Sequence, residues 1–337
     1  LAELLMDEIK LPTGVVNFVF GDLTTGQLMV RHRTPAKVAF TGSTRAGRDI
    51  RLATAGSGKR QTLELGGKSP MVVYADADLD AVVEGAVDGV FGFNYGQVCC
   101  AGSRLLVHES IANELVARIK ARLRKLRGGK ALDKAYDLGA VNSAAQCDKI
   151  GRLVAQCTKE GGEVWQPEGW TAPARGFHYP PTLCTRVQSS HTIVREEVFG
   201  PVLVVMTFRT PAEAAMLANN TCYGLAASVW TQNVGLAHWT AGKIKAGTVW
   251  VNCTQQFDPA TGFGGYRESG FGREGGWRNV LDLTVEAFAP PKPEPLAPVS
   301  ASRERLQLVP EGVDETNRFL VAGKLVRPYG AASFRVR

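Results

Sequence analysis

Short apolar segments alternate with helical patterns along most of the chain, and this alternation most constrains the possible fold. Runs of four to eight apolar residues indicate buried strands, and apolar residues three or four apart indicate helices. The predicted strands are 15–20, 36–41, 61–64, 71–74, 105–107, 202–208, 225–231 and 248–252. The predicted helices between them include 25–30, 48–54, 81–91, 144–160, 211–219 and 234–242. Strands alternating with helices predict an α/β fold.

The turn after the second predicted strand resembles a phosphate-binding turn. Gly42, Ser43 and Gly47 lie between an apolar strand and a helical pattern. Strand, glycine turn and helix form the layout in which a helix N-terminus holds a phosphate. Arg48 and Asp49 stand where a Walker A loop requires Lys and Ser or Thr, so that loop is excluded. A plain α/β turn is the alternative interpretation.

Two cysteines, Cys99 and Cys100, lie in a glycine-rich loop between a helical pattern and a short strand. A thiolate is the reactive form of cysteine, so a nucleophile here needs nearby N–H groups or a cation and access to a substrate. Glycines on both sides allow the main chain to approach a ligand closely. Spacing alone favours two buried structural cysteines, because free cysteine is among the most buried residue types.

Four motifs change that interpretation because together, in this order, they resemble the signatures of the aldehyde dehydrogenase superfamily. They are Leu63–Pro70, Gly96–Arg104, Glu196–Pro201 and Phe263–Gly270. One short motif can match by chance, whereas four in the family's order are difficult to obtain by accident. The similarity extends from about residue 11 to residue 288.

The resemblance implies an NAD(P)-dependent oxidation of an aldehyde to a carboxylic acid through a thiohemiacetal and a thioester. Cys99 corresponds to the nucleophile, its main-chain N–H to one oxyanion donor, and Glu64 to the base that activates water. An acid at a buried strand end beside glycines has a raised pKa, which suits a base. The positions corresponding to coenzyme contacts are Gly21, Gly42, Ser43, Gly47, Leu65, Glu197 and Phe199. For Glu64 and Glu197, the alternative is an ordinary surface acid.

The resemblance also implies a domain plan. Residues 1–65 correspond to the latter part of a Rossmann-like coenzyme domain, 66–267 to the α/β catalytic domain, and 268–289 to a return helix and an oligomerisation strand. Five prolines between 290 and 298 predict a linker, taken as 290–315. Residues 316–337 resemble the start of a second unit, as in the two-unit branch called family sixteen. We expect a homo-oligomer or pairing with that second unit.

The chain departs from the family pattern in three respects. The family's oxyanion asparagine, ribose lysine and first coenzyme strands would precede Leu1, so we expect a fragment that is inactive alone. One extra residue near Gly92 separates Glu64 from Cys99, which we expect to shift the preceding helix and not the chemistry. Mammalian two-unit members resemble pseudoenzymes without this cysteine, so a non-catalytic scaffold is the alternative function. Retention of Cys99, Glu64 and Glu197 favours the enzyme.

Composition and charge bound the remaining possibilities. No run of 18 apolar residues predicts a membrane span, and the first ten residues do not resemble a signal peptide. Seven cysteines without framework spacing favour a reducing compartment, taken as cytoplasmic. Neither a C-x-x-C pair nor a histidine cluster indicates a metal. The net charge is +7. Lys and Arg are densest between residues 118 and 130, where their spacing indicates the solvated face of an amphipathic helix. A nucleic-acid surface is the alternative, without a motif to support it.

Overall fold

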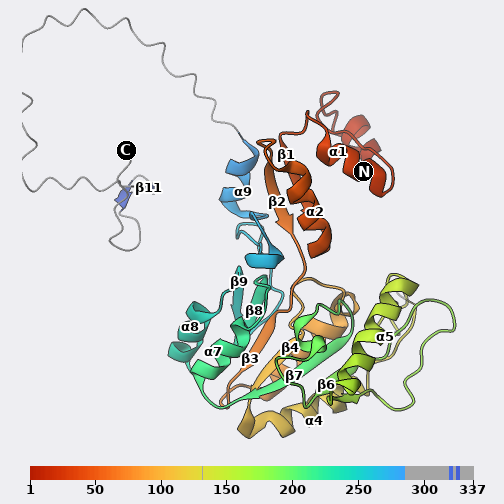
Figure 1. The fold of residues 1–337 in the computed structure, drawn as a ribbon, viewed down its shortest axis with the longest axis vertical. Coiled ribbons are helices and arrows are strands. Elements are labelled where there is room, and N and C mark those ends of the chain that lie inside the picture. Colours follow the sequence, from red (N-terminus) through yellow and green to blue (C-terminus); the bar gives the residue numbers. More distant parts are fainter. Residues whose placement is uncertain (131, 285–318, 322–323, 327–337) are drawn as a thin grey trace, which may run out of the picture. The chain divides into compact units, whose positions relative to one another are not determined.

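The computed structural model describes residues 1–130, 132–284, 319–321 and 324–326, and places them in two units, Leu1–Val285 and Glu286–Arg337. The first unit contains two separate sheets joined by the segment between Glu64 and Pro70 (Figure 1). In the second unit, β11 (Phe319–Val321) and β12 (Lys324–Val326) pair antiparallel. The assignment of this hairpin to a second aldehyde dehydrogenase unit stays a prediction.

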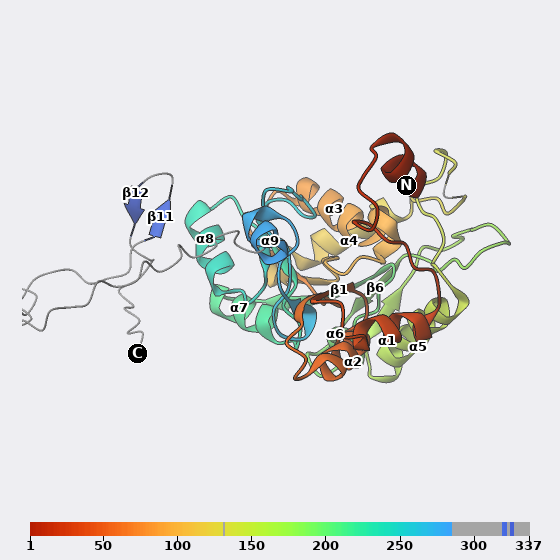
Figure 2. The ribbon, with the colours of Figure 1, turned by 90° about the horizontal axis from the view of Figure 1, so that it is seen from above.

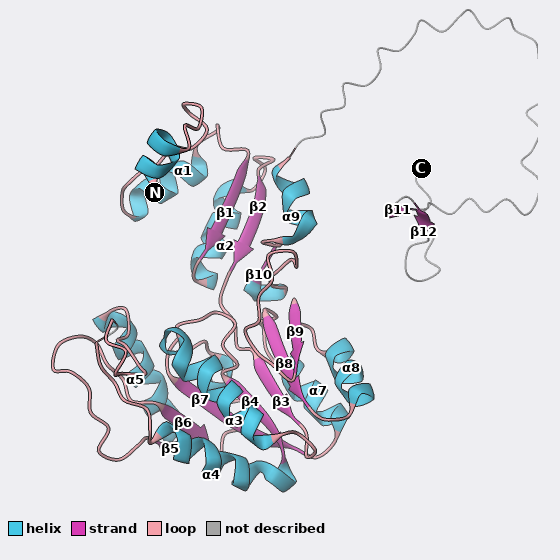
Figure 3. Cartoon of the chain, turned by 180° about the vertical axis from the view of Figure 1, so that it is seen from behind, coloured by secondary structure: helices cyan, strands magenta, loops and turns pink. Residues whose placement is uncertain are grey.

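The smaller sheet has the order β1-β2-β10. Strands β1 (Lys37–Thr41) and β2 (Arg60–Glu64) are parallel, and β10 (Gly270–Phe271) pairs antiparallel with β2. The helices beside this sheet in sequence are α1 (Leu23–Arg31), α2 (Thr44–Thr54) and α9 (Gly276–Leu283). Figure 3 shows α9 and β10 next to β2, so segments more than 200 residues apart meet here. A parallel pair with a connecting helix is the βαβ arrangement expected of a Rossmann-like half-domain.

The larger sheet has the order β5-β6-β7-β4-β3-β8-β9, and only its edge strand β5 is antiparallel to its neighbour. Its strands are β3 (Pro70–Val73), β4 (Arg104–His108), β5 (Glu163–Trp165), β6 (Thr182–Thr185), β7 (Val202–Phe208), β8 (Ala226–Trp230) and β9 (Thr248–Val251). Its helices are α3 (Leu79–Val87), α4 (Ala112–Leu123), α5 (Ala144–Lys159), α6 (Thr192–Arg195), α7 (Pro211–Asn219) and α8 (Val234–Lys243). These elements confirm the predicted α/β alternation.

Alternate strand residues reach opposite faces of the large sheet. Met71 and Leu105 join a core cluster with α3, α4 and α5, whereas Val72 and Leu106 join a second cluster with α7 and α8. Figure 2 shows α3 and α4 together and α7 and α8 together at different sides of the structure. Burial of both faces explains why these strands read as continuous apolar runs.

Two predictions at the ends of the first unit have different outcomes. The strand expected at 15–20 is wrong: this segment has no regular structure, and Phe20 is 91% exposed. A strand needs a neighbour for its N–H and C=O groups, and none of the described strands pairs with this segment. The first residues form a short π-helix, Leu4–Glu8. The strand expected over 283–288 lies mostly outside the described residues, and Leu283 ends α9.

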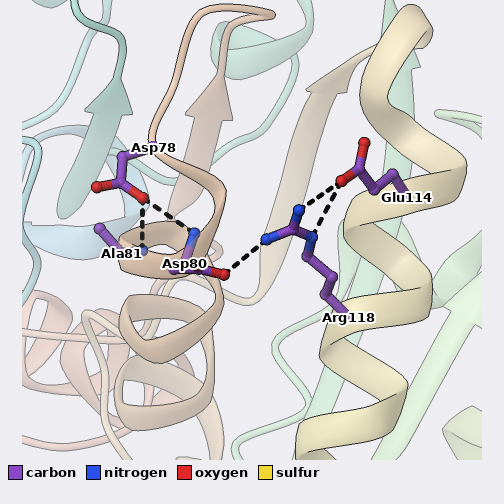
Figure 4. A network of polar contacts seen from close by, with 5 residues as sticks. All are labelled: Asp78, Asp80, Ala81, Glu114 and Arg118. Carbon is purple, nitrogen blue, oxygen red and sulfur yellow. Dashed lines mark hydrogen bonds and ion pairs between the residues drawn. The ribbon is translucent and has the colours of Figure 1, made fainter.

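The acids before α3 have structural partners. Asp78 caps the helix by accepting from the N–H groups of Asp80 and Ala81, and Asp80 binds Arg118 of α4, which also binds Glu114 (Figure 4). The basic face of α4 is therefore partly neutralised by neighbouring acids. Lys120 and Arg124 also lie over the ring of Trp165. The absence of a nucleic-acid partner stays a prediction.

Helix α3 continues directly into a π-helix, Asp88–Gly92, close to the position of the extra residue that the family resemblance implies. The N–H of Phe93 donates to the carbonyl of Asp88, five residues back. A π-turn accommodates one residue more than an α-turn, so this geometry is compatible with the expected shift of the helix. The insertion itself stays a prediction. A 3₁₀ segment, Phe93–Gly96, follows, with Asn94 and Tyr95 at positive φ. Two other 3₁₀ segments are Glu109–Ile111 and Arg267–Ser269.

The proposed domain boundaries are consistent with this architecture but not defined by it. The two sheets separate between Glu64 and Pro70, next to the boundary proposed at 65/66. However, β10, from the segment 268–289, is a strand of the smaller sheet. The linker 290–315 lies outside the described residues. We retain the five-part division as a proposal.

Arg104 connects β4 to the segment before β3 and to the C-terminal end of α7. Its fully buried guanidinium donates to the carbonyls of Lys68, Leu217 and Ala218 at 2.7, 3.0 and 2.8 Å. We expect Arg104→Leu to lower the free energy of unfolding by at least about 3 kcal/mol, because three buried carbonyls lose their donor. Urea denaturation measures this, with Arg209→Leu, an exposed arginine, as the control that changes little. Equal effects of the two variants would contradict this structural role of Arg104.

Candidate active site

A cavity of about 460 Å³ lies where the two sheets of the first unit meet. The turns after β1 and β2 contribute one side, and the loops before β4 and β7 contribute another. Its lining includes Gly42, Ser43, Glu64, Leu65, Cys99, Glu197 and Phe199, which are seven of the nine site residues predicted from the sequence. The cavity thus brings together residues separated by more than 150 positions in the chain.

The other two predicted coenzyme contacts do not line this cavity. Gly47 is buried inside α2, where a Cβ would lie 2.4 Å from the side chain of Leu65, so its backbone supports the cavity wall. Gly21 is exposed before α1, and a Cβ there would lie 2.0 Å from the Thr25 hydroxyl. The structure gives Gly21 a role in starting the helix and does not bring it to the cavity.

The turns after β1 and β2 are fixed to each other and to the C-terminal motif. The N–H of Gly42 donates to the carbonyl of Glu64, and the Ser43 hydroxyl caps α2 by accepting from Ala46. Buried Ser269 donates to the carbonyl of Gly66, and its own carbonyl accepts from Leu65. The motif at 263–270 therefore holds the segment that carries Glu64.

The Cys99 thiol is half-buried and surrounded by donors. The Cys100 thiol donates to its sulfur and lowers the pKa of Cys99, and the main-chain N–H groups of both residues act in the same direction. Burial and the Glu197 carboxylate oppose this shift. The interaction with the Cys99 sulfur and, after it, burial raise the pKa of Cys100. Of the two neighbouring cysteines, Cys99 is therefore the one whose environment favours the thiolate.

Glu64 is only 6% exposed, and neither carboxylate oxygen has a hydrogen-bond partner among the described residues. Burial raises its pKa to about 8, with smaller contributions from Cys99 and Glu274, while Arg273 opposes the shift. A Cβ on Gly264 would lie 2.6 Å from Oε1, so the glycine leaves room for the carboxyl. A carboxyl with this pKa exchanges protons near neutral pH, as a general base must.

Glu197 has a different environment in the same cavity. Its Oε1 accepts from the N–H of Gly67 at 3.0 Å. Burial raises its pKa, whereas the Gly67 N–H and the charges of Lys149 and Lys68 oppose the shift. Phe199, at φ 57°, lies in the left-handed region beside it. This anchored carboxylate suits the binding of hydroxyl donors more than proton transfer.

Several cavity residues were not identified from the sequence. Gln146 and Lys149 lie on one face of α5 and line the cavity, and Gln146 donates to the carbonyls of Val198 and Phe199. Gln97 accepts from the N–H of Asn142 and thereby holds the cysteine loop. Gln146 and Lys149 are three residues apart in a predicted helix, so the sequence could have indicated that they share one helix face.

Lys68, which belongs to a recognised motif, has an unexpected environment. It is 1% exposed, and its ammonium has no hydrogen-bond partner among the described residues. Burial, followed by the charge of Arg104, lowers its pKa to about 7.

The model of the aldehyde dehydrogenase family matches residues 1–287. The chain belongs to this family. Aldehyde dehydrogenases with comparable sequences include the mitochondrial aldehyde dehydrogenase of Homo sapiens, 44% identical over 273 residues, which cover 80% of this chain and 52% of that protein. The family resemblance inferred from the four motifs is thus confirmed. The two-unit branch stays a prediction.

Solved structures of aldehyde dehydrogenases have the same fold. An NAD+ complex from Bacillus cereus superimposes with a TM-score of 0.78 at 42% identity, covering 81% of this chain and 56% of that one. An NAD-dependent aldehyde dehydrogenase from Sinorhizobium meliloti gives 0.78 at 40% identity, with 82% and 55% coverage. The chain spans about half the length of the curated relatives it matches. Among the described residues, no helix is long and apolar enough to cross a membrane.

The environment of Cys99 predicts selective alkylation. We expect iodoacetamide to modify Cys99 at least about tenfold faster than Cys147, Cys157, Cys184, Cys222 or Cys253 in the full-length gene product, because its thiolate is stabilised. Exposed Cys222 is the informative comparison, since its access is greater but its pKa is raised. Peptide mass spectrometry at several times measures the rates. Faster labelling of Cys222 would remove the support for a Cys99 nucleophile.

The environment of Glu64 predicts a pH-dependent stability. The folded pKa of about 8 exceeds the unfolded value of 4.5, so the folded state binds more protons between them. Stability from the protonated carboxyl is complete below pH 4.5 and is lost as pH rises through 8. We expect the melting temperature of Glu64→Gln, relative to the unmodified protein, to be higher at pH 8.5 than at pH 5. Exposed Glu168→Gln is the control. A constant difference would show that Glu64 is already ionised at pH 5.

Proposed function

We propose that the protein oxidises an aldehyde to a carboxylic acid, using NAD or NADP. The observation that carries the proposal is that the Cys99 thiol and the Glu64 carboxyl, which has no hydrogen-bond partner in the described part of the chain, line one cavity. A thiol with a lowered pKa and an acid with a raised pKa are the nucleophile and the base that this chemistry requires. Among the described residues, the Glu64 carboxylate forms no salt bridge.

The residues lining the cavity fit a dinucleotide coenzyme. Glu197, Gln146 and Lys149 offer one carboxylate, one amide and one ammonium for ribose hydroxyls and phosphate. Gly66 leaves room for the Glu197 carboxylate, because a Cβ on Gly66 would lie 2.4 Å from Oε2 of Glu197. The N-terminus of α2, next to Gly42 and Ser43, favours negative charge. When bound, the nicotinamide supplies a hydride acceptor.

The chain's own residues account for the covalent steps. The Cys99 sulfur attacks the aldehyde carbon and forms a carbon–sulfur bond. Loss of hydride from that carbon leaves an acyl thioester on Cys99. Glu64 accepts a proton from water, the oxygen attacks the acyl carbon, and the thiolate leaves as the carbon–sulfur bond breaks. Donors around Cys99 stabilise the departing thiolate, so the same hydrogen bonds assist the first and last steps.

The proposed partners and compartment rest on separate observations. A small-molecule aldehyde is the proposed substrate. The exposed apolar residues Trp277, Val280, Leu281 and Leu283 on α9 support assembly with a second subunit or with a second unit of the same chain. Seven free cysteines support a reducing compartment, and we propose the cytoplasm.

Glu64→Gln in the full-length gene product tests the proposed roles. We expect a burst of reduced coenzyme equal to the enzyme concentration, followed by turnover slowed at least about a hundredfold, because only water activation loses its base. Stopped-flow absorbance with an aldehyde panel measures both phases. Cys99→Ala must abolish the burst as well. Loss of the burst in Glu64→Gln would assign Glu64 to an earlier step, and activity of Cys99→Ala would overturn the mechanism.

A further inference from the structure

Two cysteines outside the candidate active site interact with each other in the main core cluster. Cys157 lies near the end of α5 and Cys184 lies in β6, and both side chains are fully buried. The Cys184 thiol donates a hydrogen bond to the Cys157 sulfur and lowers the pKa of Cys157, while burial opposes this shift. A disulfide requires two sulfurs that can approach each other, and this pair is already in contact.

A buried cation lies near this pair. The Lys68 ammonium, on a side chain that is 1% exposed, has no hydrogen-bond partner in the described part of the chain. The interaction with Cys157 and then burial raise the pKa of Cys184, whereas the charge of Lys68 acts in the opposite direction. A cation beside a thiol stabilises its thiolate, which is the reactive form. Lys68 therefore assists a reaction in which the Cys184 sulfur becomes a nucleophile.

A short glycine loop lies against the Cys157 sulfur. Gly162 is so close that a Cβ on it would lie 2.6 Å from this sulfur. Its neighbour Gly161 is exposed and has φ 90°. A surface loop opens at a lower free energy than the strands of the core. Opening of this loop gives a molecule as small as hydrogen peroxide access to the Cys157 sulfur.

Helix α5 holds the segment that carries Glu197 from two places. Near the start of the helix, Gln146 donates to the carbonyls of the two residues that follow Glu197. At its end, Glu160 accepts from the N–H of Thr192 at 2.7 Å and from its hydroxyl at 2.6 Å. Cys157 lies one turn before Glu160. A covalent bond from Cys157 to β6 therefore fixes the helix that holds this segment.

We propose that Cys157 and Cys184 form a reversible disulfide when the protein meets hydrogen peroxide, and that this bond restrains the segment carrying Glu197. Neither sulfur takes part in the proposed oxidation of an aldehyde, so the inference goes beyond that function and does not depend on it. In a reducing compartment, disulfides of this kind are transient and respond to oxidants.

The oxidation takes two steps. The Cys157 thiolate attacks one peroxide oxygen, the O–O bond breaks and hydroxide leaves, so Cys157 becomes a sulfenic acid. The Cys184 sulfur then attacks the Cys157 sulfur and the S–O bond breaks. The hydroxide takes the proton that Cys157 released, and the sulfenic oxygen leaves as water with the Cys184 proton. The two sulfurs lose two electrons and the peroxide gains them. A dithiol reverses the bond by exchange.

Peptide mass spectrometry of the full-length gene product under non-reducing conditions identifies the bond. We expect a linked pair of peptides containing Cys157 and Cys184 after treatment with hydrogen peroxide, and its loss after dithiothreitol. The matched control is Cys147→Ala, which removes another cysteine of α5 whose thiol contacts the carbonyl of His178. The linked pair should form in this variant as in the unmodified protein. Absence of the pair from the oxidised unmodified protein, or linkage of Cys184 to a different cysteine, would overturn the proposal.

The rate of linkage tests the role of Lys68. In Lys68→Met, a side chain of similar length without the charge, we expect the linked pair to form at least about fivefold more slowly, because the Cys184 thiolate loses its cation. Lys59→Met is the control, since the Lys59 ammonium donates to carbonyls near α1. Equal rates in the two variants would contradict assistance by Lys68.

Amide hydrogen exchange over residues 192–199 measures the restraint without any turnover. We expect oxidation to slow exchange in this segment at least about threefold in the unmodified protein, because opening of the segment then requires α5 to move against the bond. In Cys157→Ala, peroxide should leave the exchange of the segment unchanged. Formation of the linked pair with unchanged exchange would overturn the restraint on the Glu197 segment, and the same slowing in Cys157→Ala would assign the effect to a different cysteine.

Discussion

The close packing of Gly66 and Gly67 against the active-site loops is the constraint on which the rest of the site depends. A Cβ on Gly66 would lie 2.4 Å from the Glu197 carboxylate, and one on Gly67 would lie 2.3 Å from the carbonyl of Cys99. At Gly67 the obstacle is a main-chain carbonyl, which cannot move aside as the end of a long side chain can. At Gly66 it is the Glu197 carboxylate, which a side chain would displace from its place in the cavity. The absence of side chains at both positions lets the chain pass from one sheet to the other with Glu64, Cys99 and Glu197 around one cavity.

The two cavity acids show how environment assigns different roles to the same functional group. Glu197 has a main-chain N–H donor and nearby cations, whereas Glu64 has apolar burial and no partner among the described residues. Burial without compensation disfavours the charged form, so the Glu64 carboxyl has the pKa of a base that works near neutral pH. The Gly67 N–H that anchors Glu197 belongs to the same segment as Glu64. Anchoring one acid therefore also orients the strand end that carries the other.

The sequence predicted elements whose signals are local and missed features that depend on tertiary contacts. The strands around Val72 and Leu106 were predictable because burial on both faces requires continuous apolar runs. The segment 15–20 has an equally apolar run, yet it has no strand partner among the described residues. Gln146 contributes to the cavity through two carbonyls more than 50 residues away, which no local pattern reveals. Family motifs identified Cys99 and Glu64, but the partners that set their pKa values required the structure.

The π-turn after α3 lies where the family resemblance implies one extra residue, and it leaves the core contacts on both sides intact. Val90 and Phe91 are fully buried in the main core cluster, and Tyr95 is buried a few residues later. An extra residue that rotated this whole segment would have moved these side chains out of the core, at about 1.5–3 kcal/mol for each large apolar group. A π-turn confines the change to one helical turn, so the core contacts and the cysteine loop are both preserved.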